Sequence, residues 1–319
     1  MSRTAFLFPG QGSQRPGMGR ALHDAFPESR AVFEEADDVL GESLSTLCFE
    51  GPEEDLRRTR NTQPAMLTVS FAAWRAVAVR GAAPDMAAGH SLGEYSALVA
   101  LGGLLFADAL RLTRRRAEFM QEAVPEGDGA MAAVLGLPAE TVAEVASEVT
   151  GRGEGLVEPA NFNGGGQVVI GGHTAAVSAA GEELKSRGAR RVLPLPVSAP
   201  FHTRLMEPAA ARLSAELDAI PFRDLSAPLW TNVDAAPIRT GTQAREALRR
   251  QVASPVRWEE TLRGMGASGA IAFVEIGQGR VLTGMVRKVL PGASAFGVSD
   301  PAGVERVQES LPESVASLS

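Results

Sequence analysis

The stretch Gly89-His90-Ser91-Leu92-Gly93 decides how the rest of the chain is interpreted. It follows a short apolar run at residues 86–88 and precedes a predicted helix at residues 94–100. This order predicts a strand, a sharp turn with serine at its apex, and a helix. Glycine on both sides of Ser91 suits a strained backbone approached closely by its neighbours. The turn would expose the Ser91 hydroxyl and point the Leu92 amide at the same centre, although a plain Gly/Ser turn also fits.

Composition and charge limit the class of protein. The chain has 319 residues, of which 45% are hydrophobic and 22% charged, as expected for one large globular domain or two modest ones. A net charge of −7 argues against a nucleic-acid surface. Cys48 is the only cysteine, which excludes an internal disulfide and a thiolate metal cluster, and we expect no metal site.

Hydropathy argues against a membrane protein. The charge-free apolar stretch at residues 95–107 is too short to span a bilayer. The first apolar run, residues 5–8, meets Pro9-Gly10 at once, so no signal peptide is expected. We therefore expect a cytoplasmic protein without a membrane partner.

Hydrophobic periodicity predicts strands alternating with helices, the pattern of an α/β protein. Strands are expected at residues 5–8, 86–88, 229–233 and 271–276. Helices are expected at residues 21–40, from Thr62-Gln63-Pro64 to residue 80, at 108–123, 207–219, 243–252 and 258–265, from Val281, and weakly after Pro301 before a tail.

Residues 126–199 have a pattern of their own. Strands are predicted at residues 131–137, 156–160, 167–170 and 191–197, and helices at 138–150 and 173–187. This βαββαβ order is typical of ferredoxin-like modules. We therefore expect an α/β-hydrolase-like large subdomain with a parallel central sheet, residues 1–125 and 200–319, into which a ferredoxin-like small subdomain, residues 126–199, is inserted.

Arg116 occupies an unusual place on the helix predicted at residues 108–123, for which Asp108 is the expected N-cap. It falls on the apolar face, between Leu112 and Phe119. The charged residues that share the opposite face are Arg111, Arg115, Glu118 and Glu122. A buried guanidinium needs an acceptor. That acceptor is either an acidic residue of the chain, in a structural pair, or the carboxylate of a substrate, which a planar guanidinium suits well.

A serine nucleophile needs a base, and the chain has only four histidines. His23 lies in a polar helix start, the side chain of His90 should diverge from that of Ser91, and His173 starts a helix of the inserted module. His202, in the loop after that module, is therefore the best base, although a structural loop histidine remains an alternative. No histidine follows it, which disfavours an ordinary hydrolase, where the histidine lies near the C-terminal end.

The loop Gly10-Gln11-Gly12-Ser13-Gln14 follows the first predicted strand. It has neither the lysine of a nucleotide-binding phosphate loop nor the dinucleotide spacing. A glutamine flanked by glycines is better suited to lend a backbone amide to a neighbouring site, and a plain turn is the alternative.

With these residues identified, the chain resembles the malonyl-CoA:acyl-carrier-protein transacylases of fatty-acid synthesis and the related acyltransferase domains of polyketide synthases. The resemblance extends from about residue 6 to about residue 290. The matching segments are Phe8-Pro9-Gly10-Gln11-Gly12-Ser13-Gln14, Thr62-Gln63-Pro64-Ala65, Gly89-His90-Ser91-Leu92-Gly93-Glu94-Tyr95, Arg116 with Phe119-Met120-Gln121, Asn161-Phe162-Asn163, Gly166-Gln167-Val168-Val169-Ile170, Pro196-Val197-Ser198, Phe201-His202, Gln251 and Val274-Glu275-Ile276-Gly277.

The resemblance implies a catalytic apparatus. Ser91 would be the acylated nucleophile and His202 its partner, without a triad aspartate. A backbone carbonyl, here that of Gln251, would orient the histidine. The amides of Gln11 and Leu92 would form the oxyanion hole.

The resemblance also implies a substrate pocket. Arg116 would hold the free carboxylate of a malonyl group, and Asn161 would help shape the site. Phe201 resembles the bulky residue that malonyl-selective polyketide acyltransferases carry before the histidine. Gln278 replaces the proline common in the last glycine turn, and no function is attached to this difference.

The expected function is that of a malonyl-CoA:acyl-carrier-protein S-malonyltransferase working by a ping-pong mechanism. Malonyl-CoA would be the donor and the phosphopantetheine thiol of an acyl carrier protein the acceptor. No permanently bound cofactor and a monomeric chain are expected. Two alternatives remain, an acyl hydrolase that clears stalled acyl groups and a non-catalytic module that binds carrier proteins.

Overall fold

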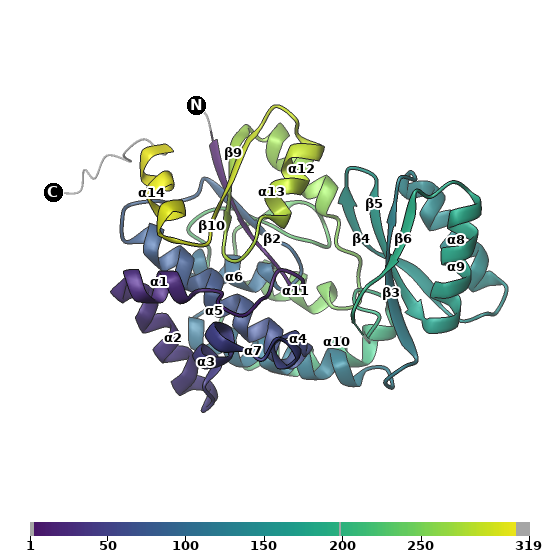
Figure 1. Cartoon of the computed structure of the whole chain (residues 1–319), viewed down its shortest axis with the longest axis horizontal. Coiled ribbons are helices and arrows are strands. Elements are labelled where there is room, and N and C mark those ends of the chain that lie inside the picture. Colours follow the sequence, from purple (N-terminus) through teal and green to yellow (C-terminus); the bar gives the residue numbers. More distant parts are fainter. Residues whose placement is uncertain (1–2, 198, 311–319) are drawn as a thin grey trace.

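The computed structural model describes residues 3–197 and 199–310, which form two β-sheets with surrounding helices (Figure 1). Ser198, from one matching segment, and the predicted tail after residue 310 lie outside the described residues. The small sheet and helices α8 and α9 stand to one side of the larger body (Figure 1). Within the described ranges, every helix is too short or too polar to cross a membrane.

The larger sheet has six strands in the order β10-β9-β1-β2-β7-β8, parallel except for β8 against β7. Its strands are β1 (Arg3–Phe8), β2 (Met86–Gly89), β7 (Leu229–Trp230), β8 (Pro237–Ile238), β9 (Ala270–Ile276) and β10 (Ser294–Val298). Residues 5–8 of the central strand β1 are all buried, which explains their uninterrupted apolar run.

The helices around this sheet cover both of its faces. They are α1 (Arg20–Ala25), α2 (Pro27–Leu40), α3 (Leu44–Glu50), α4 (Glu53–Arg57), α5 (Thr59–Ala78), α6 (Gly93–Ala100), α7 (Phe106–Glu122), the 3-10 turn η1 (Arg204–Met206), α10 (Glu207–Asp218), α11 (Gly241–Gln251), α12 (Trp258–Ala267), α13 (Val281–Val289) and α14 (Pro301–Ser310). Alternate residues of β1 point to opposite faces. Phe6 and Phe8 belong to the hydrophobic core that contains α5 and α6, and Ala5 and Leu7 to the core under α12 and α13.

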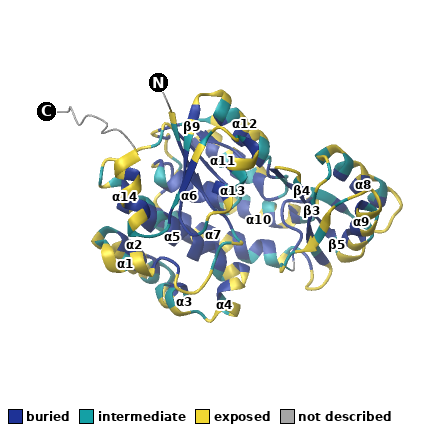
Figure 2. Ribbon diagram, turned by 45° about the horizontal axis from the view of Figure 1, so that its top comes forward, coloured by how far each residue is buried: buried dark blue, intermediate teal, exposed yellow. Residues whose placement is uncertain are grey.

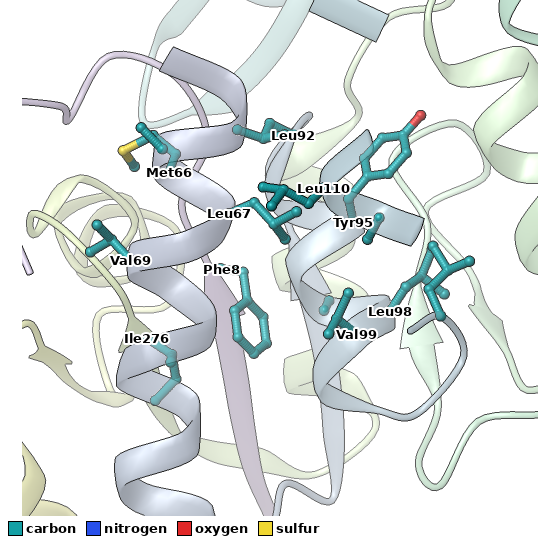
Figure 3. Packing of buried hydrophobic residues seen from close by; sticks show 14 of the residues in the cluster. Phe8, Met66, Leu67, Val69, Leu92, Tyr95, Leu98, Val99, Leu110 and Ile276 are labelled. Atoms are coloured by element: carbon teal, nitrogen blue, oxygen red, sulfur yellow. The ribbon is translucent and has the colours of Figure 1, made fainter. Parts of the chain in front are cut away.

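The predicted turn is anchored in the first of these cores. Figure 3 shows Phe8 of β1 between α5, which carries Leu67, and α6, which carries Tyr95 and Val99. All but Val99 are at most 1% exposed. Burial on this scale, at roughly 25 cal/mol per Å² of apolar surface, fixes α6 and the turn before it against the sheet.

The small sheet is antiparallel, with the strand order β4-β5-β3-β6. Its elements are β3 (Gly129–Leu135), α8 (Ala139–Gly151), β4 (Val157–Gly164), β5 (Gln167–His173), α9 (Thr174–Ser186) and β6 (Arg191–Pro194). The helices pack an apolar core of valine, alanine and leucine against one face and leave their outer faces exposed (Figure 2). The βαββαβ order and the predicted fold class are confirmed.

Several predicted boundaries were wrong. Helix α5 begins at Thr59 instead of Thr62, so Pro64 lies inside it. Pro64 is the sixth residue of α5 and lies beyond the first turn, so its missing N–H removes the helical hydrogen bond to the carbonyl oxygen of Arg60. The Thr62 hydroxyl donates to the carbonyl oxygen of Leu56 at 2.6 Å, which helps to hold the helix start.

Asp108 is not an N-cap, because α7 begins at Phe106 after Leu105. Its carboxylate lies in the first turn, near the positive end of the helix. The pattern at residues 21–40 is two helices, because the chain turns at Phe26 before Pro27. The strand expected at residues 229–233 ends at Trp230, and the edge strand β10 was missed because five residues with an internal Gly297 give little periodicity.

A short backbone connection joins the small sheet to the larger body. Strand β4 forms a parallel bridge between Asn161 and Val256. The Phe162 amide donates to the Val256 carbonyl at 2.9 Å, and the Val256 amide donates to the Ala160 carbonyl at 2.9 Å. These bonds bring β4 beside the segment that follows α11. Asn161, at this connection, lines both of the cavities described below.

Candidate active site

The turn between β2 and α6 is strained in the way its glycines suggest. Ser91 has a φ of 51°, in the left-handed region that non-glycine residues rarely adopt. A Cβ atom at Gly89 would collide with the backbone of Gly93, and one at Gly93 would collide with that of Phe8. Only glycine therefore lets α6 and β1 approach so closely that the serine is left at the apex.

His202 lies against the hydroxyl of Ser91. Its Nε2 atom is 2.7 Å from Ser91 Oγ, and its Nδ1 atom is 3.0 Å from the carbonyl oxygen of Gln251. Because a carbonyl only accepts, Nδ1 must carry the proton, which leaves Nε2 to accept the hydroxyl proton. His202 also has a positive φ, 63°, so both members of the pair lie in strained backbone.

The environment keeps His202 neutral. Burial and the nearby Arg116 guanidinium lower the pKa of His202 to about 3. The imidazole is therefore available as a base over the whole neutral pH range.

Arg116 is buried beside this pair, with 1% of its surface exposed. It donates to Oε1 of Gln63 at 2.7 Å, to Oε1 of Gln251 at 3.0 Å and to Ser91 Oγ at 3.1 Å. All three acceptors are neutral. Burial lowers the pKa of Arg116, but a guanidinium stays charged.

A second buried arginine of the same helix shows what a structural ion pair looks like here. Arg114 reaches the carboxylate of Glu42 at 2.9 Å. Arg116 has no carboxylate within 4.0 Å among the described residues. The structural pair considered as the alternative for Arg116 is thus not formed, and its positive charge lies in a cavity.

That cavity has a volume of about 110 Å³. Its walls comprise Gln11, Gln63, His90, Ser91, Leu92, Arg116, Met120, Met131, Asn161, Leu195, Val197, Phe201 and His202. It shares Gln11, His90, Asn161, Leu195 and Val197 with a larger cavity of about 560 Å³. The larger cavity extends between the glycine loop after β1, the start of α13 and the small sheet. A volume in this range is typical of ligand sites.

The amides of Gln11 and Leu92 are not engaged elsewhere. Neither N–H donates a hydrogen bond to another group within residues 3–197 and 199–310. Both residues line the small cavity with Ser91. The Ser91 amide, in contrast, donates to Oδ1 of Asn232 at 2.6 Å.

All the site residues expected from the sequence come together here. Phe201 and Asn161 line the small cavity, and Gln251 contributes its carbonyl oxygen and its side chain. The other histidines lie elsewhere or bond elsewhere: Nδ1 of His173 accepts from the Leu156 amide, and Nε2 of His90 lies 2.9 Å from Oδ1 of Asn163.

Other residues of the site were missed. Gln63 and Glu94 lie in matching segments, but nothing in the sequence indicated that their side chains reach Arg116 and Gln251. Asn232 follows a strand, as many site residues do, yet no motif marked it. In the part of the chain that the structure covers, we find no cluster of His, Cys, Asp or Glu able to hold a metal ion.

Comparisons with known proteins agree with this geometry. Residues 5–308 match the model of the acyl transferase domain family. The malonyl CoA-acyl carrier protein transacylase of Bacillus subtilis (strain 168) is 48% identical over 313 residues, which cover 98% of this chain and 98% of the relative. Its namesake from Escherichia coli (strain K12) is 46% identical over 310 residues, covering 97% and 100%. A solved structure of a type II polyketide synthase acyl-carrier protein in complex with its malonyl-transacylase matches with a TM-score of 0.94 and 46% identity, covering 97% of this chain and 99% of that chain.

Proposed function

The chain belongs to the acyl transferase family, and on that premise we propose that it transfers the malonyl group of malonyl-CoA to the phosphopantetheine thiol of an acyl carrier protein. The reaction serves fatty-acid or polyketide synthesis. The observation that carries the proposal is the pairing of a serine–histidine couple with a buried arginine that has no carboxylate partner among the described residues. The serine–histidine couple is the apparatus of acyl transfer, and the arginine selects an acyl group that ends in a carboxylate.

The first half-reaction forms malonyl-Ser91. Nε2 of His202 takes the hydroxyl proton as Ser91 Oγ attacks the thioester carbonyl carbon. The amides of Gln11 and Leu92 donate to the oxyanion, and the loss of one such donor typically costs about 3 kcal/mol. The carbon–sulfur bond breaks, and the CoA sulfur leaves with the proton from His202.

The second half-reaction reverses these steps with another thiol. The phosphopantetheine thiol gives its proton to His202 as its sulfur attacks the carbonyl carbon of malonyl-Ser91. The bond to Ser91 Oγ breaks, and that oxygen recovers the proton. In both halves Arg116 holds the malonyl carboxylate, and the larger cavity takes the long pantetheine arm of donor or acceptor.

The roles of the pocket residues are part of the proposal. Asn161 contributes to the wall where the two cavities meet, and Phe201 limits the room beside the acyl group. We also retain the division into residues 1–125 with 200–319 and residues 126–199, because the small sheet and its helices fall between Gly129 and Pro194. A cytoplasmic monomer remains a prediction from the sequence.

The test is a panel of acyl-CoA donors followed by intact-protein mass spectrometry and then by a holo carrier protein. We expect a malonyl adduct on the protein and its transfer to the carrier faster than malonate is released. Predominant release of malonate would instead support the hydrolase, and no adduct from any acyl-CoA would support the non-catalytic module. A panel of several carriers then identifies the pathway.

A further inference from the structure

The backbone of Ser91 is held from both sides by two side chains, those of Asn232 and Gln251, to which no role has been assigned so far. On one side, Oδ1 of Asn232 accepts from the Ser91 amide at 2.6 Å, and Nδ2 of Asn232 donates to the Gly89 carbonyl at 2.7 Å. On the other side, Nε2 of Gln251 donates to the Ser91 carbonyl at 3.0 Å. The strained residue is therefore clamped at both its N–H and its C=O.

The two sides meet at one carboxylate oxygen. Oε2 of Glu94 accepts from the Asn232 amide at 2.9 Å and from Nε2 of Gln251 at 3.1 Å. Asn232, Gln251 and Glu94 are at most 1% exposed. A closed ring of bonds thus runs from Ser91 through Asn232, Glu94 and Gln251 back to Ser91.

The position of Asn232 explains why an asparagine is suited to this place. Strands β2 and β7 pair as far as Ala88 and Trp230 and then diverge. The amide side chain of Asn232 uses its oxygen as an acceptor and one N–H as a donor, as the next backbone pair of a sheet would. It continues the ladder past the end of the strands and reaches the nucleophile itself.

We propose that Asn232 and Glu94 are positioning residues for acyl transfer, which hold Ser91 in its left-handed conformation and aim its hydroxyl at His202. Because the Ser91 N–H already donates to Asn232, it does not donate to the oxyanion, which is stabilised by the amides of Gln11 and Leu92. The ring fixes the amide group of Gln251 as well: with Nε2 turned to Glu94, Oε1 must face Arg116.

This inference rests on the proposed function, since its readout is the malonylation of Ser91. The main variant is Asn232→Ala in the full chain, followed by rapid quenching and intact-protein mass spectrometry. We expect the rate constant at saturating malonyl-CoA to fall about 100-fold, the size of effect that a small misplacement of a reacting group produces. The half-saturating concentration should stay within about twofold, because the residue does not touch the malonyl carboxylate.

The donor specificity separates this role from that of Arg116. Asn232 acts on the nucleophile, so labelling by acetyl-CoA should fall by the same factor as labelling by malonyl-CoA, and their ratio should not change. Asn232→Asp keeps the acceptor for the Ser91 amide but places a carboxylate against the Gly89 carbonyl. It should be slowed by about 10-fold or more and provides the measurement if the alanine variant does not fold.

Glu94→Gln has a matched control in Glu275→Gln. Both carboxylates are 1% exposed, but Glu275 accepts from the amide and hydroxyl of Thr283 in the first turn of α13 and, among the described residues, has no hydrogen bond to the residues that hold Ser91. We expect about a 10-fold slower malonylation for Glu94→Gln, whose neutral amide weakens charge-assisted bonds, and a rate within twofold of the parent for the control.

Thermal unfolding of each variant completes the experiment. Rates that fall only in proportion to the folded fraction, equal rates for the Glu94 and Glu275 variants, or a raised half-saturating concentration with an unchanged rate constant would overturn the positioning role. Absence of labelling in the parent protein would contradict the proposed function itself, whatever the variants do.

Discussion

The two sheets of this protein contribute to the site in different ways. The parallel sheet and its helices carry the groups that react or bear charge: Ser91 after β2, Arg116 on α7, and His202 before α10. The antiparallel sheet supplies wall residues, among them Met131 on β3 and Asn161 on β4. The reacting groups therefore all lie on the larger body, and the small sheet contributes part of the cavity wall.

Their interiors differ accordingly. Beneath α8 and α9 the small sheet packs hydrophobic side chains, and its buried polar side chains among the described residues, Asn161 and Asn163 on β4, both line the larger cavity. The larger body buries a connected set of polar groups around the turn, including Glu94, Asn232 and Gln251. Burial raises the pKa of Glu94 to about 7, a sign of the cost of placing a carboxylate there. Such networks specify one arrangement when every member is bonded, which a site of fixed geometry needs.

The largest expected effect is that of Ser91→Ala. Without the hydroxyl no covalent intermediate can form, and loss of a nucleophile typically lowers kcat by a factor on the order of 10⁵ to 10⁶. Intact-protein mass spectrometry after incubation with malonyl-CoA should show no adduct. A persistent adduct would mean that another residue is the nucleophile, and the reacting groups could then no longer be assigned to the larger body alone.

Arg116→Ala should change the choice of donor. Truncating one partner of a buried charge pair costs about 2–5 kcal/mol, so malonyl use should fall by a factor of about 30 or more relative to acetyl use. The measurement is the ratio of kcat/KM for malonyl-CoA and acetyl-CoA. If that ratio stays at the parent value, Arg116 has a structural role only. Its lack of a carboxylate partner, in contrast to the pair of Arg114 with Glu42, then has no bearing on the choice of donor.

The pH dependence should reflect the lowered pKa of His202. For a histidine with an ordinary pKa of 6.5, the neutral fraction that can act as a base falls about tenfold per pH unit below that value. His202, with a pKa of about 3, stays neutral in this range. In the Glu94→Gln variant, which lacks the other group that titrates in this range, the second-order rate constant of Ser91 malonylation should therefore change less than about twofold between pH 6.5 and 5.

The same shift affects stability. Because the folded pKa of His202 is lower than the unfolded one, the unfolded chain binds the proton more readily as pH falls. The contribution of His202 to stability is complete above pH 6.5 and is lost progressively from there toward pH 3. Urea unfolding at several pH values would show this loss, and an unchanged midpoint down to pH 4 would contradict it.

The smallest effect is expected from the small sheet. Asn161→Ala should lower kcat/KM for malonyl-CoA by about 10-fold or less, mainly through KM, because the residue shapes the wall. Steady-state kinetics measures the split. A fall in kcat of about 100-fold with unchanged KM would mean that the antiparallel sheet takes part in the chemistry.

The sequence alone determined the local features of the site. The strand, turn and helix around Ser91 could be predicted because glycine spacing reports backbone strain directly. His202 followed from the small number of histidines, and Arg116 from its place on an apolar helix face. The βαββαβ order was equally evident, since periodicity identifies elements well and their ends poorly, as Asp108 and Pro64 show.

Resemblance to a family supplied Asn161, Phe201 and the Gln251 carbonyl, for which the residues by themselves gave no reason. Only the tertiary structure revealed that Asn232 bonds to the nucleophile and that the Glu94 side chain bonds to Asn232 and Gln251. Asn232 is 141 positions from Ser91 in the chain, and the two meet because β7 pairs with β2. Hydrogen bonds between groups so far apart in the chain leave no periodic trace in a sequence, because they depend on how separate strands and helices are stacked.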